Sequence, residues 1–200
     1  GNVSILAVGS IAFDTIAAPG GKIEEELGGS ATYFALAASL FAPVAIVAVV
    51  GDDFPEEAVQ LFVDRGVDCS GLTRREGKTF RWCGRYEEDV NVAITESTEL
   101  GVFGEFKPEV PASCRNRPFV ALGNIDPLLQ LAVLEQVDKP AFVAVDTMNY
   151  WIDRQRDDLK EVIARADILI VNDAEAKMLG DDANLLAAMG RLLELGPRYV

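Results

Sequence analysis

Runs of apolar residues without polar alternation recur along the chain, and polar residues follow most of them. The runs cover residues 3–8, 44–50, 119–122, 142–145 and 168–171. Strands that are covered on both faces have this pattern, whereas strands with one wet face alternate. Between the runs, residues 56–65, 128–137 and 159–165 read as helices. The pattern predicts a doubly wound, mainly parallel sheet with helices on both faces, in a layered α/β domain with right-handed crossovers.

Two segments, 16–27 and 77–103, interrupt this alternation of apolar strands and helices. The second contains alternating aromatic and basic side chains, at Phe80, Arg81, Trp82, Arg85 and Tyr86. Such alternation is strand-like, but the segment is too polar for the central sheet. Both segments fit a small antiparallel β-sheet that stands off the domain as a lid over a site. An edge hairpin with a long surface loop is the alternative interpretation.

Residues 27–51 contain no charged side chain and are long enough to cross a membrane as a helix. Gly28, Gly29 and Ser30 form a turn and N-cap signal, however, and Pro43 stops any helix. The stretch is therefore expected to be a helix over 32–41 followed by a buried strand over 44–50, with no membrane contact.

Composition limits the chemistry of the chain. A formal net charge of -14 argues against general nucleic-acid binding, which needs basic patches. Because the sequence has no histidine, any base must be a carboxylate, lysine, tyrosine or thiol. Cys69, Cys83 and Cys114 lack the spacing of zinc or redox pairs. We therefore expect reduced thiols in a cytoplasmic protein without a secretory signal.

Polar residues follow four of the apolar runs. In open parallel sheets, ligands bind beyond the carboxyl ends of the strands, so these clusters predict a site on one rim of the sheet. Each residue alone is also an ordinary helix cap or turn former. The clusters contain Ser10 and Asp14, Asn124 and Asp126, Asp146 and Asn149, and Asn172 and Glu175.

Free backbone N–H groups at Gly28, Gly29 and Ser30, before the predicted helix, are expected to face a small polar ligand or anion. The chain has neither a GxxxxGK[ST] motif nor a GxGxxG motif after its first strand. These absences disfavour a P-loop ATPase and an NAD-dependent oxidoreductase, whose glycines let the backbone approach a pyrophosphate.

As an ordered set, these motifs resemble the ribokinase-like, or PfkB-type, carbohydrate and nucleoside kinases over essentially the whole chain. The resemblance implies an α/β domain with a β-sheet lid, and transfer of the γ-phosphoryl group of ATP to a hydroxymethyl group with Mg²⁺. The matching motifs are Val8-Gly9-Ser10 with Asp14, Leu27-Gly28-Gly29-Ser30-Ala31, Val50-Gly51-Asp52-Asp53, Arg65-Gly66-Val67-Asp68, Asp146 with Asn149, and Asn172-Asp173-Ala174-Glu175.

The resemblance also implies roles for individual residues. Asp14 would hold substrate hydroxyls, since hydrogen bonds to a carboxylate are stronger than neutral ones, and Phe80 and Trp82 would cover the substrate. Asn172 and Glu175 would lie near ATP and Mg²⁺, with Glu175 acting through water. The remaining implied substrate contacts are Gly28, Gly29, Ser30, Tyr33, Asn124, Asp146 and Asn149.

The chain departs from the family pattern at several points. Tyr33 stands where an asparagine is usual, and no arginine follows Asn149 closely, which disfavours a keto-acid sugar. The Gly-Ala-Gly-Asp motif, which carries the catalytic aspartate and the anion hole, is absent from these residues. Residues 198–200 begin another apolar run, so we expect an incomplete ribokinase-like domain over 1–200.

Two functions follow from this interpretation. The first is an ATP-dependent kinase acting on a sugar or nucleoside. A polypeptide of this kinase that ends at Val200 is expected to be inactive. The second is a non-catalytic sugar- or nucleotide-binding module. The lid face that carries Arg81 and Arg85 also suggests a homodimer, because an isolated small sheet needs cover.

Overall fold

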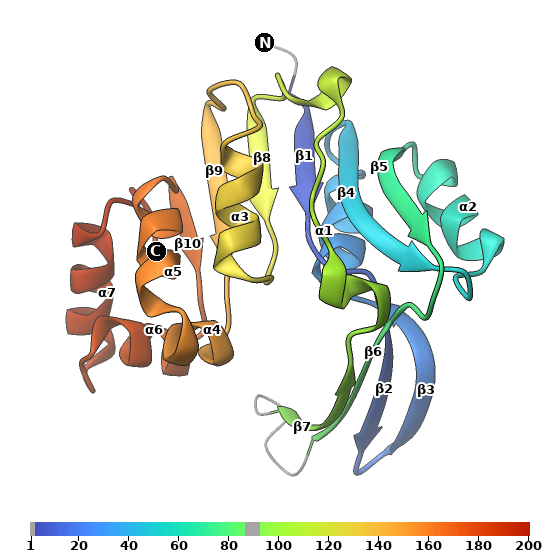
Figure 1. The fold of residues 1–200 in the computed structure, drawn as a ribbon. Helices are drawn as coiled ribbons and strands as arrows, with labels where there is room; N and C mark the ends of the chain where they lie inside the picture. The colour runs from blue at the N-terminus through green and yellow to red at the C-terminus, as the bar shows by residue number, and fades with distance from the viewer. Residues whose placement is uncertain (1–2, 87–92) are drawn as a thin grey trace. The chain divides into compact units, whose positions relative to one another are not determined.

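A computed structural model describes residues 3–86 and 93–200, which form two compact units (Figure 1). One unit, here called the C-terminal unit, consists of the start of the chain up to Val8 together with Pro108–Val200. The other, the N-terminal unit, is Gly9–Lys107. Each unit carries part of the polar clusters predicted from the sequence, so each is described by itself.

The C-terminal unit contains four parallel strands in the order β10-β9-β8-β1. Their short apolar runs are the predicted ones, and Val120, Leu122, Val143 and Val145 are buried among them. The strands are β1 (Ile5–Val8), β8 (Phe119–Leu122), β9 (Phe142–Asp146) and β10 (Ile168–Ile170). The helices are η2 (Ala112–Cys114), α3 (Pro127–Leu134), α4 (Asn149–Arg154), α5 (Arg156–Ala164), α6 (Asp173–Gly180) and α7 (Leu185–Glu194).

The helices of this unit bury one apolar face each. On α5, Leu159 and Ile163 are spaced by one helical turn and are fully buried, while Asp157 in its first turn is exposed. After α7 the chain returns to the sheet, where the Leu169 N–H donates to the Tyr199 carbonyl at 3.0 Å. Tyr199 forms an isolated parallel bridge with Ile168, so the strand expected at 198–200 is a single bridge here.

The N-terminal unit combines a parallel pair of strands with a separate four-stranded sheet. The pair is β4 (Val44–Gly51) and β5 (Asp68–Arg75). In the chain, α1 (Ser30–Ala38) precedes β4, and α2 (Glu56–Asp64) connects β4 to β5. All eight residues of β4 are buried, because both of its faces are covered. The uncharged stretch 27–51 is therefore a helix and a buried strand, and among the described residues no helix has the length and apolarity to span a membrane.

The four-stranded sheet, here called the small sheet, has the order β3-β2-β6-β7. Its strands are β2 (Ala12–Ala18), β3 (Gly21–Gly28), β6 (Phe80–Tyr86) and β7 (Ala93–Glu99), followed by η1 (Gly101–Glu105). The expectation of a purely antiparallel sheet is wrong, because β2 and β6 run parallel. A parallel pair needs a long crossover, which the intervening α1, β4, α2 and β5 supply.

The small sheet starts at Ala12, before the segment 16–27 assigned to it from the sequence. Asp14 is thus a residue of this sheet and not of a loop after β1. The α/β class, the parallel strands and the separate small sheet are confirmed.

Candidate functional site

In the N-terminal unit, Asp14 lies against the backbone of Gly28. Ala12 pairs with Gly28 and Asp14 pairs with Glu26 in the β2–β3 register. A methyl group added at Gly28 would overlap the Asp14 carboxyl group, so only glycine leaves room for it. Burial raises the pKa of Asp14 above its usual value. The sequence therefore builds a half-buried carboxyl group that lies against a glycine of the neighbouring strand.

The start of α1 is closed by a reciprocal pair of serines. The Ser10 N–H donates to Ser30 Oγ at 3.2 Å, and the Ser30 N–H donates to Ser10 Oγ at 3.2 Å. The Ala31 N–H donates to the Ser10 carbonyl at 2.9 Å. The expectation that the N–H groups of Gly28, Gly29 and Ser30 face a ligand is wrong for Ser30, because Ser10 Oγ already accepts its hydrogen bond.

Gly29 allows this closure to form. Its φ of +95° lies in a region that side chains rarely adopt, and a Cβ there would overlap the Ser10 carbonyl. Gly28 and Gly29 thus have different roles: the first makes room for Asp14, and the second turns the chain into α1.

Tyr33 extends from α1 into the surroundings of Asp14. Burial raises the pKa of the Tyr33 hydroxyl, and the negative charges of Asp14, Tyr86 and Glu26 add to that rise in this order. Its side chain is nevertheless 60% exposed, so its ring is open to solvent or a ligand. Asp14 is therefore close enough for its charge to act on Tyr33, and the substrate role implied for both residues stays a prediction.

Trp82 lies on the same face of the small sheet as Asp14, since the two residues are register partners in β2 and β6. Its ring covers Gly84, where any side chain would overlap it. Its indole Nε1–H donates to Thr95 Oγ1 at 3.1 Å. Phe80 instead stacks on Phe103 of η1, with ring centroids 5.3 Å apart. It thus packs at the end of the small sheet where β6 begins, here called the base of the small sheet.

A polar network at that base escaped the sequence analysis. Asp53 Oδ1 accepts hydrogen bonds from the Thr79 N–H and hydroxyl, each at 2.8 Å, and Oδ2 accepts one from Arg81 at 2.7 Å. Arg81 also donates to Glu25 at 2.7 Å. Burial would raise the pKa of Asp53, but these hydrogen bonds and the Arg81 charge lower it overall. The network joins the turn after β4 to β6 and β3.

Asp146 is the central side chain of the polar cluster in the C-terminal unit. It ends β9, and its Oδ1 accepts a hydrogen bond from the Thr147 N–H at 2.9 Å. Burial, with a smaller contribution from the Glu175 carboxylate, raises the pKa of Asp146 to about 6. Asp146 is therefore partly protonated just below neutral pH.

Buried Gln130 ties this cluster to the neighbouring strand. Its side-chain amide donates to the Gly123 carbonyl at 2.9 Å and to the Asp146 carbonyl at 3.0 Å. The sequence analysis missed Gln130 because it sits inside an apolar helical stretch. Asn124 and Asn149 also have protein partners: Asn124 Oδ1 accepts from Trp151 Nε1 at 3.0 Å, and Asn149 Oδ1 accepts from the Tyr150 N–H at 2.9 Å.

Asn172 and Glu175 form a capping box at the start of α6. Asn172 Oδ1 accepts from the Glu175 N–H at 2.8 Å, and Glu175 Oε2 accepts from the Asn172 N–H at 2.9 Å. Among residues 3–86 and 93–200, no three side chains of the metal-binding types gather in one place. A single Glu175 carboxylate fits Mg²⁺, which proteins commonly hold by one or two carboxylates, water and substrate phosphates.

Solved structures with this architecture are ribokinase-like proteins. An adenosine kinase from Sinorhizobium meliloti matches with a TM-score of 0.78 and 18% identity, over 98% of this chain and 73% of its own. An E. coli protein crystallised with ATP and Mg²⁺ matches with a TM-score of 0.73 and 16% identity, over 98% of this chain and 70% of its own. The fold is therefore ribokinase-like.

The sequence comparison is more specific. Residues 3–200 match the family model described as pfkB family carbohydrate kinase. A cytidine kinase from Thermococcus kodakarensis is 30% identical in an alignment of 184 residues, which covers 88% of this chain and 64% of that protein. The chain belongs to the PfkB family, and it spans less than two thirds of the length of this curated relative.

Proposed function

We propose that this chain is part of an ATP-dependent kinase that transfers the γ-phosphoryl group to a hydroxymethyl group of a sugar or nucleoside. The observation that carries the proposal is the Asp14–Gly28 arrangement within a chain that matches the family over residues 3–200. A half-buried carboxylate suits a polyol, because it accepts strong hydrogen bonds from hydroxyl groups and Gly28 leaves space beside it.

In this proposal the two clusters have different tasks. Asp14 accepts the acceptor's hydroxyl groups, while Gly28, Gly29, Ser30, Tyr33 and Trp82 line the space around it. Asn172 and Glu175 lie near the nucleotide, Glu175 contacts Mg²⁺ through water, and the small sheet acts as a lid. Phosphoryl transfer depends mainly on positioning and on neutralising charge, which these groups supply in part.

Two roles are narrower than the sequence implies. Phe80 stacks on Phe103, so its contribution to acceptor binding is indirect, through the base of the small sheet. Asn124, Asp146 and Asn149 are proposed as substrate-binding residues of the C-terminal unit, and Asp146 is the one whose charge changes near neutral pH.

The test is a phosphorylation screen with ATP and Mg²⁺ over sugars and nucleosides, cytidine first, using a polypeptide that extends past residue 200. The Asp14→Asn variant should bind the accepted substrate about 1.5–3 kcal/mol more weakly, as expected for a hydrogen bond to a charged group, and should stay folded. Asp153→Asn, at an exposed position of α4, is the matched control. Unchanged affinity in a folded Asp14→Asn protein would remove the role of Asp14.

A non-catalytic sugar- or nucleotide-binding module is the second candidate, in which the half-buried Asp14 and the residues around it bind a ligand without turnover. A polypeptide ending at Val200 should bind acceptor without turnover. If this polypeptide phosphorylates any acceptor, the catalytic aspartate is not confined to a Gly-Ala-Gly-Asp motif.

We further propose a cytoplasmic homodimer that assembles through the small sheet. Register pairing puts Phe13 and Arg81 side by side on the face opposite Asp14, with the Arg81 guanidinium 5.1 Å from the Phe13 ring centroid. Sedimentation equilibrium tests the assembly. The wild-type chain should dimerise as its concentration rises, and Arg81→Ala should weaken that dimer; a wild type that stays monomeric at all concentrations would contradict the proposal.

A further inference from the structure

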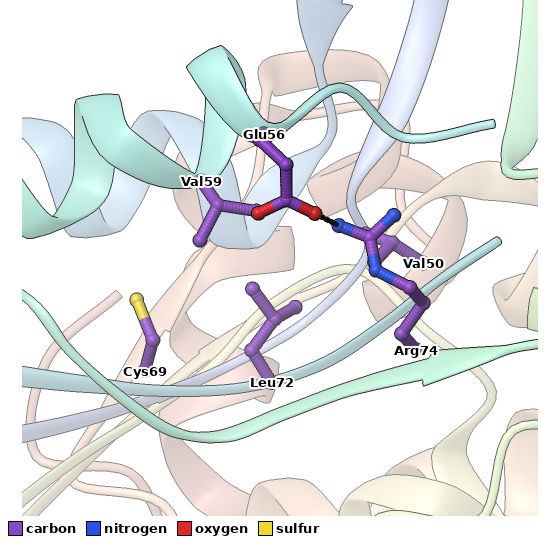
Figure 2. A pocket seen from close by; sticks show the side chains of 6 residues that line it. All are labelled: Val50, Glu56, Val59, Cys69, Leu72 and Arg74. Atoms are coloured by element: carbon purple, nitrogen blue, oxygen red, sulfur yellow. Dashed lines mark hydrogen bonds and ion pairs between the residues drawn. The ribbon is translucent and has the colours of Figure 1, made fainter. Parts of the chain in front are cut away.

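A cavity of about 220 Å³ lies between α2 and β5 in the N-terminal unit (Figure 2). Its walls are the apolar side chains of Val50, Val59 and Leu72 and the thiol of Cys69. The Glu56–Arg74 ion pair lies at one end of it, as Figure 2 shows. None of these residues belongs to the proposed kinase site.

A bulge in β5 creates this lining. Ala45 pairs with Asp68 and Val47 with Gly71, so β5 has one more residue than β4 in this interval. Residues 69 and 72 would face opposite sides of a regular strand, but the bulge turns both toward α2. Leu72 and Arg74 then share that face by ordinary alternation. Phe62 is the fully buried side chain of α2, and Val59 of the same helix lines the hollow.

Arg74 is held in place by the backbone. Its Nη1 donates to the Phe54 carbonyl at 2.7 Å and to the Gly51 carbonyl at 3.2 Å. These two bonds fix the plane of the guanidinium, so its Nη2 edge is already positioned for a carboxylate. A ligand that binds there loses little conformational entropy in ordering the arginine.

Glu56 now occupies that edge, with Oε1 2.6 Å from Nη2. The Glu56 side chain is 82% exposed, and exposed ion pairs contribute little to stability. Glu56 can swing into solvent when another carboxylate takes its place. A carboxylate attached to an apolar group would gain more, because its apolar part would leave water for the Val50, Val59 and Leu72 walls.

We propose that this cavity binds a small apolar carboxylic acid, with its carboxylate on Arg74 and its hydrocarbon part against Leu72 and Val59. The volume is sufficient, since an apolar cavity of roughly 150 Å³ admits benzene. One aromatic ring or a short branched chain is therefore the expected size of the ligand.

The test uses 4-fluorobenzoate as the probe, followed by ¹⁹F NMR, and 4-fluorobenzyl alcohol as the uncharged comparison. The benzoate should bind saturably and at least tenfold more tightly than the alcohol. Glu56→Gln should tighten benzoate binding, because it removes the competing carboxylate. Leu72→Phe, which fills the cavity, and Arg74→Gln should each weaken it at least tenfold.

Arg75→Gln is the matched control, because Arg75 is the neighbouring exposed arginine on the other face of β5. It should leave benzoate binding unchanged. Since Arg74→Gln also removes bonds to the Gly51–Phe54 turn, circular dichroism must show that it folds. Leu72→Phe and Glu56→Gln test the site if it does not.

Alkylation of the cysteines reports the location of the probe. Cys69 lines the cavity, whereas Cys83 lies in β6. Bound benzoate should slow the alkylation of Cys69 and leave the rate at Cys83 unchanged. Absence of saturable binding, equal affinity for the alcohol, or an unprotected Cys69 would each overturn the proposal.

Discussion

The Asp14 carboxyl group occupies the space that a side chain at residue 28 would need. This contact joins two adjacent strands of the small sheet and positions the one buried carboxyl group of β2. Gly28 is therefore a structural requirement for the Asp14 position, and the proposed acceptor contact depends on a residue that offers no side chain itself.

Gly28→Ala should displace the Asp14 carboxyl group and destabilise the protein by roughly 1–3 kcal/mol, the usual cost of overpacking. Gly20→Ala is the control, because a Cβ at Gly20 meets nothing within 4 Å. Urea unfolding of both variants gives the comparison. Equal stabilities for the two variants would show that Asp14 moves aside without cost.

Asp53→Asn should destabilise the base of the small sheet by about 1–3 kcal/mol, because the amide loses its charge pairing with Arg81. The folded-state pKa of Asp53 is lowered, so its stabilising contribution is present above the unfolded-state pKa and is lost as pH falls through the folded-state pKa. The difference in free energy of unfolding between wild type and variant should therefore shrink in acid.

Glu24→Gln provides the control for Asp53→Asn. The Lys22–Glu24 pair lies in the same sheet, but both of its side chains are more than half exposed. We expect no measurable change in stability from Glu24→Gln. A pH-independent difference for Asp53→Asn would instead indicate a packing effect.

Asp146 should give the opposite pH dependence. Its pKa is raised to about 6 in the folded protein, so the folded state binds more protons than the unfolded state between about pH 4 and pH 6. The stability of the wild type should therefore fall, relative to Asp146→Asn, as pH rises through that window. Denaturant unfolding at several pH values measures this difference.

The coupling of Asp146 to Glu175 has its own readout. Glu175→Gln removes a negative charge that raises the pKa of Asp146, so an NMR titration should show the Asp146 midpoint moving to lower pH. An unmoved midpoint would mean that burial alone sets the pKa.

Asn172→Ala should remove the cap of α6 and reduce stability by roughly 0.5–2 kcal/mol. Asn184→Ala is a matched control, since Asn184 Oδ1 caps α7 through the Ala187 N–H at 3.1 Å. Both variants should lose similar stability in thermal unfolding, but only Asn172→Ala should weaken nucleotide binding. Equal nucleotide affinity for the two variants would restrict Asn172 to capping.

Much of the fold could be predicted because its signals are local. The uncharged stretch 27–51 carries its own turn and stop signals, and it folds as α1 and β4. The Asn172-to-Glu175 spacing likewise indicates a helix start, and the structure has a complete capping box there.

Other features depend on residues far apart in the sequence. The parallel pairing of β2 with β6 could not be predicted, because strand direction depends on the long crossover between them and not on either strand's pattern. The Asp53–Thr79–Arg81 network was missed for the same reason, because Asp53 lies 26 and 28 residues before its partners. Gln130 was missed because it lies in an apolar helical stretch, and only the fold shows that its amide bonds the Gly123 and Asp146 carbonyls.

The sequence by itself determined the α/β class, the main helices and strands, and the polar residues that form the candidate sites, because periodicity, capping and turn preferences act over a few neighbouring residues. Only the tertiary structure decided that Gly28 makes room for Asp14, that Ser10 closes the start of α1, and that a bulge opens a cavity beside Arg74. These features arise from close packing between distant segments, where steric fit and burial decide which groups meet.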